Sequence, residues 1–182
     1  MRWAFLSIAL LTSACTFSAE RPLFSASDAA YPIADGARME MREAAHLESE
    51  PTRIIVRRAA EGGYEFVSAD PADDREAMHV LFVAVPETPA EDYIIQARLD
   101  PGEAGVAFAF AWRTPNGFRV LTDPDELDAI ERLDPRCERL AYGECRLATP
   151  EAVRAIARDL VAPAFIEGGR VSESAIDLVA ID

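Results

Sequence analysis

The chain has 182 residues, half of them hydrophobic, and its formal net charge of −14 comes from 32 acidic and 18 basic residues. This hydrophobic content supplies a core and excludes wholesale disorder, and the length suits a single domain. An acidic surface repels phosphate backbones and anionic headgroups, so we expect no nucleic-acid partner and no membrane contact through a basic patch.

The first fifteen residues form a leader. Arg2 carries a positive charge, residues 3–11 are uncharged and largely apolar, and the small residues 12–14 precede Cys15. The apolar run is shorter than the ~20 residues that a membrane-spanning helix needs. This pattern resembles a bacterial lipoprotein signal peptide, in which a lipobox directs cleavage before the cysteine and lipid attachment to it. The resemblance implies that residues 1–14 are removed and that Cys15 carries acyl chains.

The lipidated cysteine would fix the location of the protein. The resemblance implies a lipid anchor in the bacterial envelope, facing the periplasm. Thr16, which is not Asp, follows the cysteine, and in lipoproteins of the enterobacterial kind this favours the outer membrane over the inner one. The alternative is an ordinary secretory signal cut near Ala14 or Ala19, with Cys15 incidental.

A tether is expected after the leader. Residues 15–36 are rich in Ser, Ala, Asp and Pro and show little periodicity. Two apolar clusters, 22–24 and 31–33, are able to pack on a domain. We therefore predict a tether over 15–36 and a single β-rich domain over 37–182.

Short segments of two-residue periodicity follow, separated by turn residues such as Gly62-Gly63 and Asn116-Gly117. Seven consecutive strands are predicted over 38–42, 53–58, 64–68, 79–85, 93–99, 106–112 and 118–122. Parallel pairing would require crossover helices that the pattern lacks, so an antiparallel meander is the simplest topology. A meander of this length curls into a barrel or is covered by helices.

Two helices are predicted after the strands. Asp123, Pro124 and Glu126 form a helix-start signal for a helix that extends to Leu133, and Thr149 caps a second helix that Pro163 ends. The apolar residues 176–181 can return to the sheet as a last strand. The predicted fold is therefore α+β: a curved antiparallel meander, able to form a partly closed small barrel, with two C-terminal helices.

Two cysteines remain once Cys15 is lipidated. Cys137 and Cys145 flank a short polar segment that contains a glycine. Their spacing is not CxxC, and an exported protein meets an oxidising compartment where disulfides persist. We predict a structural disulfide, and a redox or metal-binding thiol pair is the alternative.

Catalytic and metal-binding signals are weak. Neither His46 nor His79 has a partner at ligand spacing, and no HExxH, GxSxG or phosphate-loop motif occurs. The acidic stretches 70–76, 87–92 and 123–128 lack the spacing of a calcium loop and are read as solvated turns or helix caps. We therefore expect no enzyme activity, no metal and no cofactor.

An aromatic stripe is the remaining candidate for a site. In the strand 106–112, large residues alternate with alanine, and aromatic residues of neighbouring strands join the stripe. The stripe is either a packed sheet core or the wall of an apolar cavity inside a barrel. The candidate ligand face consists of Tyr93, Phe108, Phe110, Trp112 and Phe118.

These patterns lead to a hypothesis of a membrane-anchored envelope lipoprotein acting as a non-catalytic binding or interaction module. Its partners would be the membrane, through the lipid on Cys15, and another envelope protein. The alternatives are a small barrel that carries a hydrophobic molecule and a barrel-type protease inhibitor, the latter by analogy of fold alone.

Overall fold

The structure is a computed structural model that describes residues 17–43, 50–73, 77–86, 91–98, 105–121, 136–140, 145–158 and 175–181. Cys15, His46 and the helix expected over 123–133 lie outside these residues. Among the described residues, no helix has the length and apolar character needed to cross a lipid bilayer.

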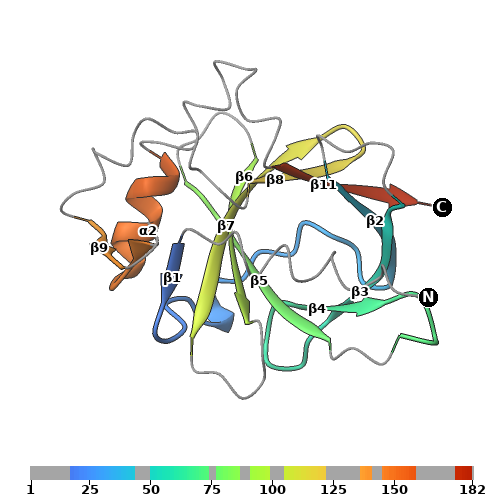
Figure 1. Cartoon of the computed structure of the whole chain (residues 1–182), viewed down its shortest axis with the longest axis horizontal. Coiled ribbons are helices and arrows are strands. Elements are labelled where there is room, and N and C mark those ends of the chain that lie inside the picture. The colour runs from blue at the N-terminus through green and yellow to red at the C-terminus, as the bar shows by residue number, and fades with distance from the viewer. Residues whose placement is uncertain are drawn as a thin grey trace.

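The chain is built mainly of antiparallel strands (Figure 1). The elements are β1 (Phe17–Ala19), η1 (Ala26–Asp28), β2 (Ala37–Glu43), β3 (Thr52–Arg58), β4 (Tyr64–Ser68), β5 (Met78–Ala84), β6 (Asp92–Arg98), β7 (Val106–Thr114), β8 (Gly117–Leu121), β9 (Glu138–Arg139), β10 (Cys145–Arg146), α2 (Pro150–Ile156) and β11 (Ala175–Ile181).

Eight of the strands close into a barrel. Strands β2 to β8 pair in sequence, β6 also pairs with β7, and β11 pairs antiparallel with both β8 and β2. The predicted meander and the predicted return of residues 176–181 to the sheet are confirmed. The barrel is fully closed, which removes its sheet edges. Of the two predicted C-terminal helices, the described residues contain the second one, α2.

Helix α2 begins as its sequence predicts. Thr149 has extended backbone angles, and its hydroxyl oxygen accepts a hydrogen bond from the Ala152 N–H, while Pro150 occupies the first helical turn. Val153 and Ile156 are fully buried on the face that α2 presents to the sheet. This burial places α2 over the outer side of the barrel.

The barrel separates two hydrophobic clusters. The inner cluster fills the barrel and contains Met39, Val56, Tyr64, Phe82 and Phe118. The outer cluster lies between the outer side of β5 to β7 and a second layer made by β1, residues 20–30, β10 and α2. Strands β5, β6 and β7 are consequently buried on both faces, which explains why their sequences are so rich in apolar residues.

The N-terminal segment differs from the expected tether. Phe17 is 1% exposed, and β1 pairs antiparallel with β7 and parallel with β10. Phe24 and Ile33 are also buried. Residues 17–36 therefore belong to the folded domain, because their apolar side chains cover the outside of β5 to β7 and one end of the barrel.

Gln96 attaches this segment to the outside of the barrel. Its side-chain oxygen accepts hydrogen bonds from the backbone N–H groups of Leu23, at 2.8 Å, and Phe24, at 3.0 Å, and its amide nitrogen donates to the Phe24 carbonyl at 3.1 Å. Gln96 itself is 6% exposed. One buried side chain thus satisfies three backbone groups that have no strand partner.

Replacing Gln96 by Leu should destabilise the protein. The substitution keeps the side-chain bulk but leaves three backbone groups without partners, and each unpaired buried group costs about 1–3 kcal/mol. We expect the free energy of unfolding to fall by several kcal/mol, which urea denaturation would show as a lower midpoint concentration. Gln96→Glu keeps the acceptor oxygen and loses the donor, so its midpoint should lie between those of the parent protein and Gln96→Leu. An unchanged midpoint in Gln96→Leu would show that the attachment of residues 20–30 contributes little to the stability of the protein.

Candidate functional site

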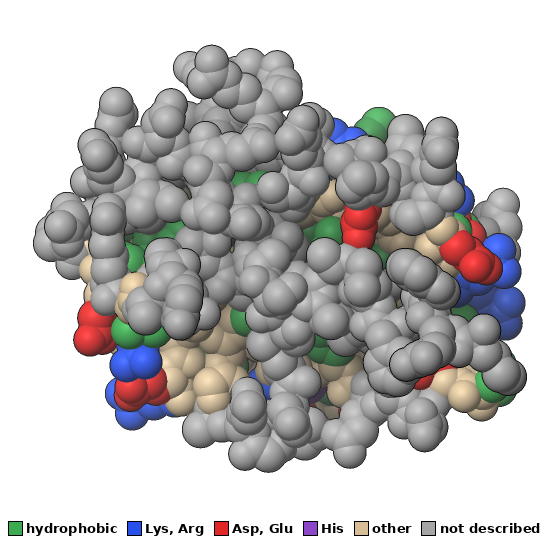
Figure 2. Space-filling view, viewed as in Figure 1, with side chains coloured by type: hydrophobic (Ala, Val, Ile, Leu, Met, Phe, Trp, Pro, Cys, Tyr) green, Lys and Arg blue, Asp and Glu red, His purple; other side chains and the backbone are tan. Residues whose placement is uncertain are grey.

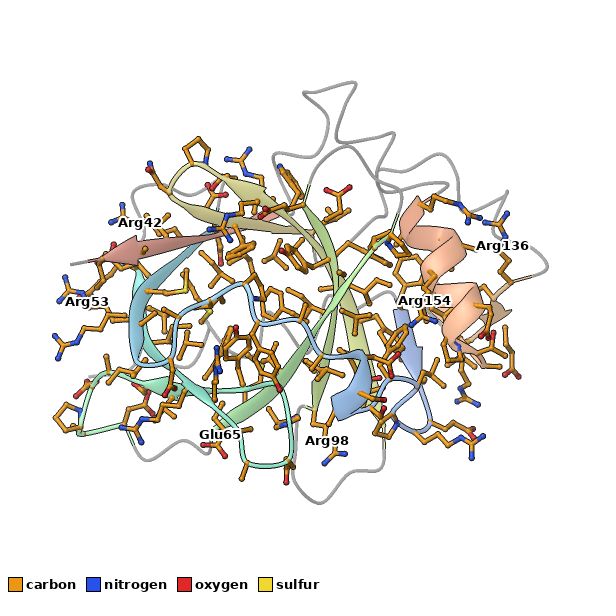
Figure 3. The ribbon with its side chains drawn as sticks, turned by 180° about the vertical axis from the view of Figure 1, so that it is seen from behind. Arg42, Arg53, Glu65, Arg98, Arg136 and Arg154 are labelled. Carbon is orange, nitrogen blue, oxygen red and sulfur yellow. A yellow bond between two sulfur atoms is a disulfide. The ribbon has the colours of Figure 1, made fainter. Side chains whose placement is uncertain are left out.

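The barrel interior divides into two halves, one at each end. We call the end where β2, β4, β6 and β8 finish the cavity end, and the opposite end the plug end. The plug segment, residues 30–36, runs across the plug end within the ring of strands (Figures 1 and 3). The two halves differ in how completely side chains fill them.

The plug segment is fixed by specific contacts. The Ala30 N–H donates to the Phe82 carbonyl at 2.7 Å. The Tyr64 hydroxyl donates to the Ile33 carbonyl at 2.7 Å and accepts from the Ile33 N–H at 2.9 Å. Burial raises the pKa of Tyr64, so its hydroxyl stays protonated and able to donate. Arg113 donates to the Pro32 carbonyl at 3.2 Å.

Aromatic rings fill the interior behind the plug segment. Phe82 lies at the centre, with ring centroids 5.8 Å from Tyr64, 5.9 Å from Tyr93 and 5.7 Å from Phe118. Tyr93 and Phe118 also meet edge-on at 5.8 Å. These distances are those of favourable edge-to-face and tilted aromatic pairs. This half of the barrel is a packed core.

The cavity end contains an apolar cavity of about 40 Å³. Every residue that lines it is apolar: Met41, Phe66, Met78, Val80, Ile95, Ala97, Ala107, Phe108, Ala109, Val120, Ile176 and Leu178. Three alanines on the adjacent strands, Ala97 of β6 and Ala107 and Ala109 of β7, leave the space because each contributes only a methyl group to the wall. The volume is well below the ~150 Å³ of an engineered cavity that binds benzene, so it suits a small apolar group.

Two methionine side chains form part of the wall of this cavity. Met41 of β2 and Met78 of β5 border it, and Met78 is only partly buried. Methionine side chains are unbranched and adopt many rotamers, so they adapt to differently shaped partners. Glu43, also partly buried, lies two residues beyond Met41 on the same side of β2, so the inner wall ends in a carboxylate.

The structure divides the predicted aromatic face between the two clusters. Tyr93 and Phe118 lie inside the barrel, and burial raises the pKa of Tyr93. Phe108 and Phe110 belong to the outer cluster, with rings against Phe24 at 6.3 Å and Phe17 at 5.6 Å. Trp112 is partly buried against the same outer cluster. These five residues therefore do not form one ligand face, and of them only Phe108 borders the cavity.

The alternation within β7 is real, but its direction could not be read from the sequence. Ala109 and Ala111 face the barrel interior, and the bulky residues face outward. The second layer of β1 and α2 provides the partner surface for the large side chains. Sequence reasoning missed the lining residues Met41, Met78 and Ile176, which the two-residue alternation would have identified once barrel closure was known.

The outer surface of β2 carries internally compensated charges. The Glu40 carboxylate accepts from Arg42 and, at 3.2 Å, from Arg53, and the hydrogen bond from Arg42 followed by that from Arg53 lowers the pKa of Glu40. Arg119 makes two hydrogen bonds to Asp177, at 2.7 and 3.0 Å. Figure 3 places Arg42 and Arg53 on the outside of the barrel, and Figure 2 shows acidic and basic side chains together at that edge.

The structure places Cys137 and Cys145 close enough for the predicted disulfide. The sulfur atoms of Cys137 and Cys145 lie at disulfide distance, with Cα atoms 5.3 Å apart, and β9 pairs antiparallel with β10 beside them.

The described histidine, His79, is the second residue of β5. Its Nε2 atom lies 2.8 Å from the Gly62 carbonyl oxygen and 3.5 Å from a carboxylate oxygen of Glu61. Within the described ranges, no group of three or more His, Cys, Asp or Glu side chains is placed to hold a metal ion.

Comparison of the chain with protein-family models, with curated proteins and with solved structures found no match. The geometry of the site is therefore the basis for assigning its function.

Proposed function

We propose that this chain is a lipid-anchored, non-catalytic binding protein of the bacterial envelope, and that its binding site is the apolar cavity at the cavity end. The anchor is the lipid predicted on Cys15. The observation that carries the binding role is the lining of the cavity, because twelve apolar residues from seven strands surround it without a polar side chain. An eight-stranded barrel is just wide enough to hold one small ligand.

The proposed ligand is a small apolar group, or the apolar end of a longer molecule. A volume of about 40 Å³ admits only a few carbon atoms unless Met41 and Met78 move aside. The packed rings at the plug end limit how far a ligand can enter. The site thus lies in the half of the barrel at the cavity end, next to the last residues of β2, β4, β6 and β8.

Filling the cavity should abolish ligand binding. Ala109 is 6% exposed and borders the cavity, so Ala109→Leu would place a branched side chain into it. We expect xenon to shift the methyl resonances of cavity-lining residues in NMR spectra of the parent protein and not in this variant. The matched control is Ala84→Leu, which makes the same change at an exposed position at the plug end of β5.

The outcomes of this experiment separate the hypotheses. Xenon-dependent shifts that Ala109→Leu removes and Ala84→Leu retains would support a ligand site. Equal responses in the parent protein and Ala109→Leu would overturn the cavity as the site and favour the interaction module, in which the barrel acts only as a scaffold for its outer surface and loops.

A further inference from the structure

The connection between the predicted lipid anchor and the folded domain is very short. Phe17 is the first residue of β1, pairs with Phe108 and Cys145, and is 1% exposed. Its ring meets that of Phe110 edge-on at 5.6 Å. The chain is therefore fixed from Phe17 onward, and only Thr16 separates it from Cys15. Two residues span at most ~7 Å, so the anchor cannot be far from the start of β1.

We propose that this short connection holds one face of the barrel on the bilayer surface. The inference rests on the proposed lipid anchor at Cys15 and goes beyond it, because a lipoprotein on a long tether has no fixed orientation. The docking face consists of the outward side chains of Trp112 of β7 and Arg119 of β8, which lie beside the start of β1. Its occupant is the headgroup layer of the membrane that carries the acyl chains.

The strand register identifies these residues. β1 runs antiparallel to β7, with Phe17 opposite Phe108 and Ala19 opposite Val106, so the N-terminal end of β1 is the end nearer to Phe110 and Trp112. From Phe110 onward β8 occupies this side of β7, and Trp112 lies directly opposite Arg119. Phe108, Phe110 and Trp112 share the outer face of β7. Continuing along β7 from the start of β1, the first outward side chains after Phe110 are therefore Trp112 and, on β8, Arg119.

The chemistry of this face suits a headgroup layer. Trp112 is partly buried, so part of its surface remains accessible. Tryptophan is enriched where an apolar ring meets polar headgroups. Arg119, with 38% of its side chain exposed, is bound by Asp177 through two hydrogen bonds, so the pair adds little net charge. Beside the anchor, these residues provide one partly accessible indole and one compensated ion pair, while Asp92, directly opposite Trp112 on β6, is 9% exposed.

The protein contains its own reporter for this contact. Of its two tryptophans, Trp3 lies in the predicted leader, so Trp112 is the sole tryptophan of the mature chain. Lipidated protein would be reconstituted into phosphatidylethanolamine–phosphatidylglycerol vesicles with and without brominated phosphatidylcholine. We expect brominated lipid to lower Trp112 emission roughly twofold, because an indole in the interface approaches the brominated acyl chains.

The matched control lengthens the connection without changing the domain. A flexible Gly-Ser insert of about ten residues between Thr16 and Phe17 has an r.m.s. length of roughly 17 Å. This variant should remain in the vesicle fraction and lose the quenching. Equal quenching in both proteins, or no quenching of a vesicle-bound parent protein, would overturn the docking face. A parent protein that carries no lipid and leaves the vesicles would instead overturn the proposed anchor.

Discussion

Phe82→Ala should destabilise the protein by about 3–5 kcal/mol, on the scale of a fully buried aromatic residue cut back to alanine. The Phe82 ring is 0% exposed and meets the rings of Tyr64, Tyr93 and Phe118. Its backbone carbonyl also accepts the hydrogen bond from Ala30 that attaches the plug segment. Removing the ring therefore leaves a void bordered by aromatic side chains of three other strands, β4, β6 and β8.

Urea denaturation followed by circular dichroism would measure this loss. Ile55→Ala is the matched control, because Ile55 is a β-strand residue that is only partly buried. We expect the control to lose much less unfolding free energy than Phe82→Ala. Similar losses in the two variants would mean that the interior rings are not the main source of stability.

Cys15→Ser should abolish the proposed lipid anchor, so that no cleaved mature protein remains in washed membranes. Without the cysteine thiol no acyl chain can be attached. The described residues offer no helix able to span a bilayer in its place. A single acyl chain already gives measurable membrane binding, and additional chains make the anchoring stable. We expect the parent protein in washed membranes and the variant either in the soluble fraction or retained as an uncleaved precursor.

Metabolic labelling with a radioactive fatty acid separates these cases. Label in the parent protein and none in Cys15→Ser would support lipidation at this residue. A variant that stays in washed membranes with its leader removed would contradict the lipoprotein assignment and favour an ordinary secretory signal.

Local sequence pattern predicted the strands well because each carries its own signal. Alternation over 38–42 and 53–58, and the turn glycines at 62–63, identify β2, β3 and the turn before β4 without any tertiary information. Gly62 and Gly63 both have positive φ, as the turn requires. The capping residue Thr149 likewise located the start of α2.

Features that depend on closure could not be predicted in the same way. The alternation in β7 predicted one face of large side chains and one of alanines, but which face of a strand points inward depends on the layer that covers it. The partner layer comes from residues 17–30, whose weak periodicity indicated a tether. The position of the cavity depends on which strand ends meet when β6 pairs with β7 and β11 enters between β2 and β8.

The placement of β11 also determines when the barrel can form. Its two neighbours, β2 and β8, lie far earlier in the chain, and no other strand occupies the gap between them. Until β11 arrives, both neighbours present unpaired backbone groups along an open edge, which can recruit another chain. Closure of the barrel therefore requires a contact of high sequence separation between β2 and β11, a kind of contact that forms slowly. A chain of this topology keeps an open edge, at which it can aggregate, until its eighth strand is in place.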